Sequence, residues 1–115
     1  MANLKELKVS SVNSDSQPLN PQEFEKYKPE LPDWRIIQED DEPRLQRQFK
    51  FKDFKSALSF SNKVGEIAER ENHHPAILVE WGKVTVTWWT HKIRGLHQND
   101  FIMAALTDGL FQSES

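Results

Sequence analysis

Three of the four histidines in this 115-residue chain lie close together in the sequence. His73 and His74 are adjacent and precede Pro75, and His91 follows sixteen positions after the proline. Histidine can accept or donate a proton near neutral pH, so such a group can carry out acid–base chemistry. Because Pro75 favours an extended conformation at His74, the two adjacent imidazoles should point in opposite directions and line a pocket rather than bind one small ion.

Each histidine also has an ordinary structural interpretation. A histidine pair at the end of a helix can cap its carbonyl groups and interact favourably with the helix dipole, or it can be exposed to solvent. His91 alone, at the end of a strand, would more often be a surface residue than a catalytic one. His97 has no partner motif, so we interpret it as structural.

Other catalytic classes have less support. A zinc hydrolase would use three protein ligands and an open coordination position, but the chain lacks the HExxH spacing. The absence of cysteine excludes disulfides, thiolate catalysis and cysteine-bound metal centres. The chain also has neither a serine-nucleophile elbow nor a glycine-rich phosphate loop. Proton transfer without a metal is therefore favoured, and it suits an elimination or a dehydration.

Length and composition narrow the class of protein further. A chain of 115 residues forms one domain and leaves no room for a separate cofactor domain. The net charge of −3, with 15 basic and 18 acidic residues spread along the sequence, predicts no binding of nucleic acid or an anionic membrane. Because the N-terminus lacks an apolar signal region and no apolar run could span a bilayer, we expect a cytoplasmic protein.

The first half of the chain predicts a tail, a short helix and two strands. Residues 1–20 are polar and without sustained periodicity, which predicts a flexible N-terminal tail before a single domain over 21–115. Asn20 and Pro21 form a helix-start pattern, and the helix should end near Tyr27. Strands are predicted over 33–38 and 44–51, joined by an acidic turn over 39–43. On the second strand one face carries Leu45, Arg47, Phe49 and Phe51, where Arg47 must lie at an edge, extend its charge to solvent or contact a partner.

The second half predicts a long helix, two strands and a final helix. The long helix should run over 53–71, with an apolar stripe of Phe54, Ala57, Leu58, Val64, Ile67 and Ala68. Strands follow over 76–81 and 83–91, joined at Gly82, with Val84, Val86 and Trp88 on one face and Thr85, Thr87, Trp89 and His91 on the other. The final helix is predicted over 99–110, with Ile102, Ala105 and Leu106 in the core.

This order of elements describes an α+β domain with a four-stranded antiparallel sheet and helices packed on one face (order α-β-β-α-β-β-α). Such a sheet has exposed edges and one uncovered face, both of which can pair with another subunit. We therefore expect a homodimer or a homotetramer.

The pattern of potentially reactive residues resembles the active-site motif of the pterin-4-alpha-carbinolamine dehydratases. In this chain the motif consists of Glu71, His73, His74, Pro75, Trp81, His91 and Asp100. The resemblance extends from about Leu31 to Asp108 and leaves the N-terminal tail uncovered. Two departures are visible: Ala76-Ile77 replace a common Glu-Trp after the histidine pair, and His97 replaces a common Thr cap, which Asn99 could take over.

The resemblance implies removal of water from 4a-hydroxytetrahydropterin to give quinonoid dihydropterin, which recycles the pterin cofactor of aromatic amino acid hydroxylases. It implies no metal and no organic cofactor. His73 and His91 would act as general acids or bases toward the 4a-hydroxyl, and His74 would bind and position the pterin. Asp100 would orient an imidazole, or else be an ordinary residue of a helix N-terminus. Weaker supporting candidates, each with an ordinary structural alternative, are Trp81, Glu69 and Glu71.

Relatives of this family also serve as interaction modules, including a dimerisation cofactor of a homeodomain transcription factor and assembly factors for a carbon-fixing enzyme. A non-catalytic dimerisation, assembly or transcriptional cofactor module is therefore the alternative function. Some such relatives lose catalytic histidines, whereas this chain keeps His73, His74 and His91. Their presence favours the enzyme. An enzyme that recycles pterin is expected to have a functional link to an aromatic amino acid hydroxylase.

Overall fold

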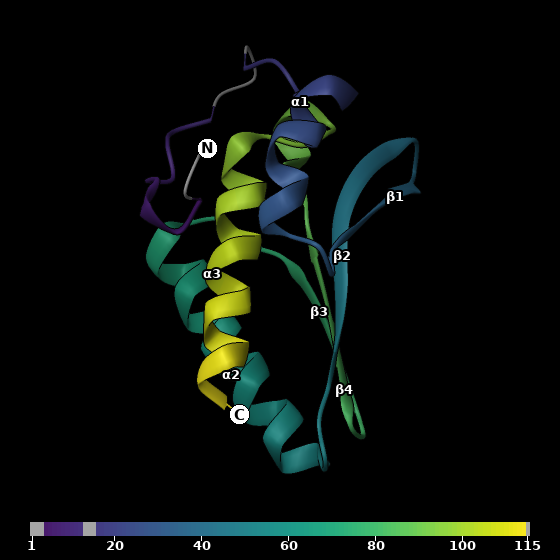
Figure 1. Cartoon of the computed structure of the whole chain (residues 1–115), viewed down its shortest axis with the longest axis vertical. Coiled ribbons are helices and arrows are strands. Elements are labelled where there is room, and N and C mark those ends of the chain that lie inside the picture. Colours follow the sequence, from purple (N-terminus) through teal and green to yellow (C-terminus); the bar gives the residue numbers. More distant parts are fainter. Residues whose placement is uncertain (1–3, 13–15, 115) are drawn as a thin grey trace.

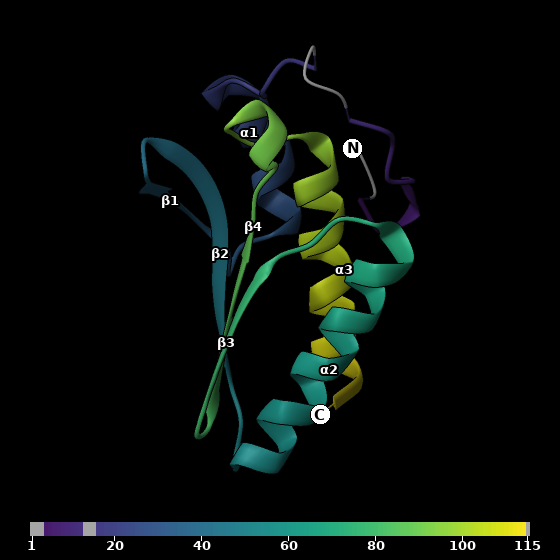
Figure 2. The same cartoon turned by 180° about the vertical axis from the view of Figure 1, so that it is seen from behind.

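A computed structural model describes residues 4–12 and 16–114. Four antiparallel strands form one sheet in the order β1-β2-β4-β3, and the helices pack together on one side of it (Figures 1 and 2). The predicted α+β fold class is therefore confirmed. None of the helices in the described ranges has the length and apolar character needed to cross a bilayer.

The elements follow the predicted order. The strands are β1 (Arg35–Glu39), β2 (Glu42–Lys50), β3 (Ala76–Glu80) and β4 (Lys83–Trp88). The helices are α1 (Pro21–Tyr27), α2 (Phe54–Glu71) and α3 (Gln98–Glu114). Short 3-10 turns are η1 (Leu4–Glu6), η2 (Lys28–Glu30) and η3 (His91–Ile93).

Local capping explains where α1 and α2 begin. The Asn20 side chain accepts a hydrogen bond from the Glu23 N–H at 2.9 Å, and the Glu23 carboxylate accepts one from the Asn20 N–H at 3.0 Å. This reciprocal capping box satisfies two N–H groups that the first turn of a helix leaves free. At α2 the Asp53 carboxylate accepts from the Ser56 N–H at 2.7 Å, and Asn72 ends the helix in a left-handed conformation with φ 53°. The chain therefore turns directly before His73.

The turn between β1 and β2 is shorter than the predicted 39–43. Only Asp40 and Asp41 lie outside the strands, and both have positive φ angles, of 53° and 61°. Two-residue turns with this conformation match the twist of paired strands, and Asp tolerates the left-handed region. Glu42 and Pro43 consequently belong to β2, opposite Glu39 and Gln38.

The buried face of α2 differs from the predicted stripe. Ala57, Val64, Ile67 and Ala68 are buried as expected, whereas Phe54 and Leu58 are 46% and 43% exposed. The centre of the buried face is Phe60, whose ring lies 4.8 Å from that of Phe49 and 5.2 Å from that of Phe51. Helical spacing alone could not choose between neighbouring stripes, because the choice depends on where the aromatic side chains of β2 lie.

The second hairpin and the segment after it also differ in detail. β3 ends at Glu80, and Gly82 occupies the turn with φ 74°, where a Cβ atom would lie 3.1 Å from the Phe51 carbonyl oxygen. β4 ends at Trp88, so His91 does not lie on the polar face of a strand as predicted but begins η3. The reason is a bridge in which the Thr90 N–H donates to the Gly95 carbonyl at 2.9 Å and closes a loop over the intervening residues.

Helix α3 is longer and more buried than predicted. It runs from Gln98 to Glu114 rather than over 99–110. Ile102 and Ala105 are buried as expected and Leu106 is half-buried, while three further buried core residues are Phe101, Met103 and Ala104. This follows because α3 contacts the sheet, α2 and η1 on different sides (Figure 1).

The described residues of the predicted tail contact the domain. Leu4 is fully buried, and its N–H donates to the Glu30 carboxylate at 2.9 Å. Further along, the Leu19 N–H donates to the Leu96 carbonyl at 2.8 Å. Figures 1 and 2 both show this segment beside α3 and the C-terminal end of α2. Flexibility of residues 1–20 stays a prediction.

Candidate active site

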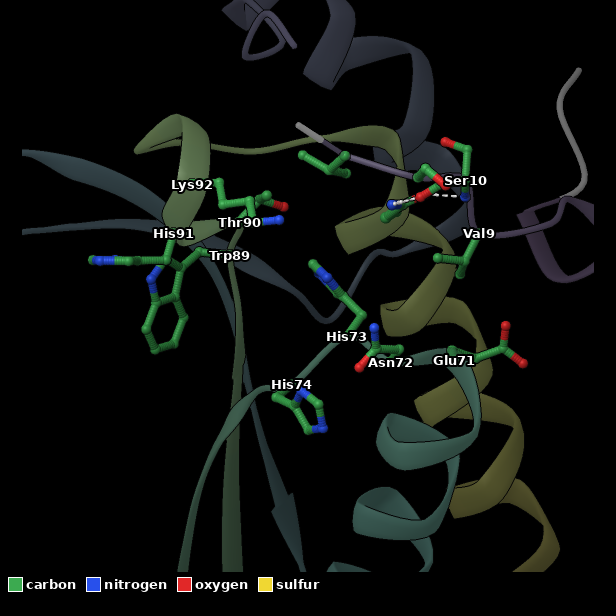
Figure 3. A pocket seen from close by; sticks show the side chains of 13 residues that line it. Val9, Ser10, Glu71, Asn72, His73, His74, Trp89, Thr90, His91 and Lys92 are labelled. Atoms are coloured by element: carbon green, nitrogen blue, oxygen red, sulfur yellow. Dashed lines mark hydrogen bonds between the residues drawn. The ribbon is translucent and has the colours of Figure 1, made fainter. Parts of the chain in front are cut away.

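A pocket of about 510 Å³ lies where α2 ends and α3 begins (Figure 3). Three stretches of chain line it, 9–12, 71–74 and 89–92, together with Asn99. The pocket contains all three histidines predicted to act in catalysis, His73, His74 and His91. The fold therefore brings together side chains from the α2–β3 connection and from η3.

His73 is the most firmly held of the three histidines. Its Nε2 atom lies 2.6 Å from Oδ1 of Asp100, its side chain is 12% exposed and Asp100 is fully buried. The imidazole also stacks on the indole of Trp88, with the ring centroids 5.7 Å apart and the planes 6° from parallel. The carboxylate and the indole together restrict both the position and the orientation of the imidazole.

The buried Asp100 carboxylate is fully engaged. Besides its bond to His73, Oδ2 accepts a hydrogen bond from the Thr90 hydroxyl at 2.7 Å and another from the His97 N–H at 2.9 Å. Asp100 is the third residue of α3, where the helix dipole favours a negative charge. These three bonds and the helix dipole offset the cost of burying the Asp100 side chain next to His73.

This geometry gives His73 a defined chemical capacity. Because an ionised carboxylate only accepts hydrogen bonds, Nε2 of His73 must carry the proton that it shares with Asp100. In the neutral ring Nδ1 is then left without a proton and can accept one. In the described part of the chain no hydrogen bond engages Nδ1 of His73. The imidazole can therefore take up a proton from a bound molecule, and the resulting charge would face Asp100.

His74 is held more loosely at the edge of the pocket. Its Nε2 atom pairs with Oε2 of Glu69, and the two side chains are 56% and 78% exposed. Glu69 does not itself line the pocket, whereas Glu71 does, and the Glu71 carboxylate accepts a hydrogen bond from the Arg70 guanidinium at 2.9 Å. A solvated pair of this kind suits contact with a ligand better than a fixed acid–base role.

Trp81 is not brought to the pocket within this chain. It is 74% exposed and lies in the β3–β4 turn, at the opposite end of the sheet from the pocket (Figure 1). A substrate-binding role for Trp81 stays a prediction.

The cap of α3 is His97 and not Asn99 as predicted. Nδ1 of His97 accepts a hydrogen bond from the Asn99 N–H at 3.0 Å, while the Asp100 carboxylate accepts from the His97 N–H. Burial lowers the pKa of His97, with the Asp100 charge opposing this shift and His73 adding to it. The Asn99 side chain is instead occupied by Ser10. His97 therefore has the structural role expected from its lack of a partner motif.

Sequence reasoning missed the part of the pocket formed by Val9–Val12. The segment lies in the predicted tail and shows no helical or strand periodicity. Its one signal is the presence of Leu4, Leu7 and Val9 among polar residues, all three of which contact or belong to the core. Among residues 4–12 and 16–114, no three His, Asp or Glu side chains are grouped so as to hold a metal ion.

The fold and the site together define a small α+β protein with a histidine-lined pocket, in which one imidazole is held by a buried carboxylate. Residues 17–110 match the family model described as pterin 4 alpha carbinolamine dehydratase. The chain belongs to this family.

Relatives and solved structures agree with this assignment. The chain is 48% identical over 115 residues to a protein of Microcystis aeruginosa provisionally named pterin-4-alpha-carbinolamine dehydratase, covering 100% of this chain and 99% of that one. It is 51% identical over 112 residues to a protein of the same provisional name from Nitrosococcus oceani, covering 97% and 99%. A crystal structure described as transcriptional coactivator/pterin dehydratase from Brucella melitensis superposes with a TM-score of 0.73 at 30% identity, covering 82% of this chain and 98% of that one.

A more distant structure shares the fold alone. It is described as a pterin dehydratase-like protein that is a RuBisCO assembly factor in the alpha-carboxysome. Its TM-score is 0.56 at 22% identity, covering 67% of this chain and 87% of that one.

Proposed function

We propose that this protein removes water from 4a-hydroxytetrahydropterin to give quinonoid dihydropterin, by general acid–base catalysis with histidine. The observation that carries the proposal is that His73, held by Asp100, lines one pocket with His74 and His91, in a chain of the pterin carbinolamine dehydratase family. The reaction would recycle the pterin used by aromatic amino acid hydroxylases. The proposal places this protein in the cytoplasm.

The reaction needs two proton transfers. The C4a–O bond breaks with its electron pair going to oxygen, and a general acid supplies the proton that lets the hydroxyl leave as water. A general base takes the proton from the neighbouring ring nitrogen as the carbon–nitrogen double bond forms. No net proton is gained or lost by the enzyme after both transfers.

His73 and His91 are assigned to these two transfers. The Asp100 carboxylate next to His73 would stabilise an imidazolium, which supports the use of His73 as a proton acceptor. His91 would then supply the proton to the departing hydroxyl. His74, which is more exposed and paired with Glu69, would bind and position the pterin.

The proposal includes self-association as a homodimer or homotetramer. The strands β1 and β3 are both edges of the sheet, and edge strands offer unpaired backbone groups to another chain. Leu78 on β3 and Trp81 beyond it are 57% and 74% exposed, which supports burial of this region against a second copy.

A non-catalytic dimerisation, assembly or transcriptional cofactor role is the second candidate. It draws support from the description of the Brucella melitensis protein, which names a transcriptional coactivator together with a pterin dehydratase. The grouping of three histidines in one pocket favours the enzyme, because an interaction module has no need for it.

Turnover of chemically generated carbinolamine, with and without a chelator, tests the proposal. We expect wild-type activity that survives chelation, and a fall of roughly 10²-fold or more in His73→Ala and His91→Ala. His97→Asn is the matched control, since it changes a histidine that caps α3 and can keep a capping side chain. Wild-type rates in both alanine variants would overturn the assignment of residues. A folded wild-type protein without activity would favour the second candidate.

A further inference from the structure

The N-terminal segment Val9–Val12 lies outside the part of the chain that matches the family model, residues 17–110, yet it lines the pocket. In Figure 3 Val9 and Ser10 lie on one side of His73, and Trp89 to Lys92 lie on the other. Val9 and Val12 are half-buried, whereas Ser10 and Ser11 are exposed. The segment thus adds both apolar and hydroxyl groups to a pocket otherwise formed by histidine-bearing loops.

One side chain fixes this segment. The Asn99 carboxamide donates from Nδ2 to the Ser10 carbonyl at 2.8 Å and accepts at Oδ1 from the Ser10 N–H at 2.9 Å. These two bonds join residues 89 positions apart, and Asn99 is only 1% exposed. An amide that donates to and accepts from one residue fixes the backbone there in position and in direction.

The same turn of α3 also positions the catalytic pair. Asn99 is followed directly by Asp100, whose carboxylate holds His73. The segment Val9–Val12 and the imidazole of His73 are therefore both hydrogen-bonded to the first turn of α3. Packing of Leu7 and Val9 against the core supports the segment on its other side.

We propose that Asn99 is a positioning residue that holds Val9–Val12 as a wall of the pterin pocket, and that this wall sets the affinity for the pterin. The inference rests on the proposed function and deepens it. A wall that excludes water and contacts the ligand contributes to binding in the ground state and in the transition state alike. Its loss should therefore raise KM and leave kcat nearly unchanged.

Two variants disrupt the hydrogen bonds between Asn99 and Ser10, one at each residue. Asn99→Ala removes both hydrogen bonds from the helix, and Ser10→Pro removes the N–H of the segment without changing α3. Asn20→Ala is the matched control, because it also removes asparagine–backbone bonding near the N-terminus but lies outside the pocket. Circular dichroism establishes that each variant folds.

The readouts are carbinolamine kinetics and a fluorescence titration with pterin, which is a stable probe. In Asn99→Ala and Ser10→Pro we expect KM and the pterin Kd to rise roughly tenfold, the size of change that loss of one or two hydrogen bonds produces. We expect kcat within about threefold of wild type. The control should match wild type.

Failure of the inference and failure of the proposed function give different results. If the wild type turns over and binds pterin but both variants keep wild-type KM and Kd, the inference is wrong and the proposed function stands. A fall in kcat at unchanged KM would also overturn the inference, because it would make Asn99 a support of Asp100 only. A wild type that neither binds pterin nor turns over would overturn both.

Discussion

Nε2 of His73 and Oδ1 of Asp100 lie 2.6 Å apart, although the residues are 27 positions apart in the chain. The contact connects the turn after α2 to the first turn of α3. Among the described residues, His73 is the only histidine lining the pocket that is held by a fully buried carboxylate.

Replacing Asp100 with Asn should strongly reduce turnover. An amide has nearly the same shape, but its NH2 group facing Nε2 would favour the opposite tautomer of His73, with the proton on Nδ1. We expect kcat to fall roughly 10²-fold or more, with KM within about threefold. Steady-state carbinolamine kinetics measure both.

Thr90→Val is the control for this change. It removes one donor to Asp100 while leaving the bond to His73 in place, and should reduce kcat by less than about tenfold. Equal kcat in Asp100→Asn and wild type would show that the carboxylate has no part in the chemistry.

Replacing Glu69 with Gln should have a small effect. The His74–Glu69 pair is solvent-exposed, and exposed pairs contribute roughly 0–1 kcal/mol. We expect kcat and KM within about threefold of wild type, and the same thermal midpoint. A fall as large as that of Asp100→Asn would mean that His74, and not His73, is the imidazole that needs a carboxylate.

His97 should make the protein less stable in mild acid. Burial lowers the pKa of His97 in the folded state, so the unfolded chain binds that proton more readily. Stability is then lost as the pH falls below the ordinary histidine pKa of about 6.5. Protonation of Nδ1 would also break the cap on the Asn99 N–H.

His97→Asn provides the comparison, because Asn can cap a helix and does not titrate. Urea unfolding at about pH 5 and about pH 8 should show a smaller loss of stability in acid for the variant than for wild type. Identical losses would show that the acid sensitivity comes from other groups.

Arg47 and Asp108 should be energetically coupled. Arg47 donates to Oδ1 of Asp108 at 2.6 Å and stacks over Phe49 at 4.3 Å, and the same oxygen accepts from the Trp34 indole at 2.8 Å. Burial nevertheless raises the pKa of Asp108, so the guanidinium and the indole do not fully compensate for the desolvation of the carboxylate.

Arg47→Met should therefore cost about 2 kcal/mol at neutral pH, since it leaves the part-buried Asp108 carboxylate without its cation. Asp108→Asn keeps an acceptor for Trp34 and gives the second single variant. The double variant should lose less than the sum of the single losses, by about 1 kcal/mol or more, in denaturant unfolding. Additive losses would show that the two charges do not interact appreciably.

Local chemistry made much of the fold predictable. The helix start at Asn20-Pro21, the start of α2 at Asp53 and the turn at Gly82 depend on residues a few positions apart, and all are found where the sequence predicts them. The order of elements and the α+β class follow from these signals together with apolar periodicity. The interpretation of Arg47 could not be settled in this way, because its partner Asp108 lies 61 positions away.

The errors share one cause. The stripe of Phe54 and Leu58 fits helical spacing as well as the observed face centred on Phe60, and only the rings of β2 decide between them. Likewise the sequence pattern of β4 continues to His91, but the Thr90–Gly95 bridge ends the strand earlier. Periodicity shows which residues of an element share a face and does not show what that face meets.

The sequence by itself determined which potentially reactive groups the chain carries, the order of the elements and the resemblance to the pterin dehydratase family. Only the tertiary structure decided that Asp100 holds His73 and is not simply an acidic residue at a helix N-terminus. It also decided that Trp81 lies far from the pocket of its own chain and that Val9–Val12 line this pocket. The physical reason is the range of the contacts. Hydrogen bonds across 27 and 89 positions form only after packing of the core has placed α3 against the α2–β3 connection and the N-terminal segment.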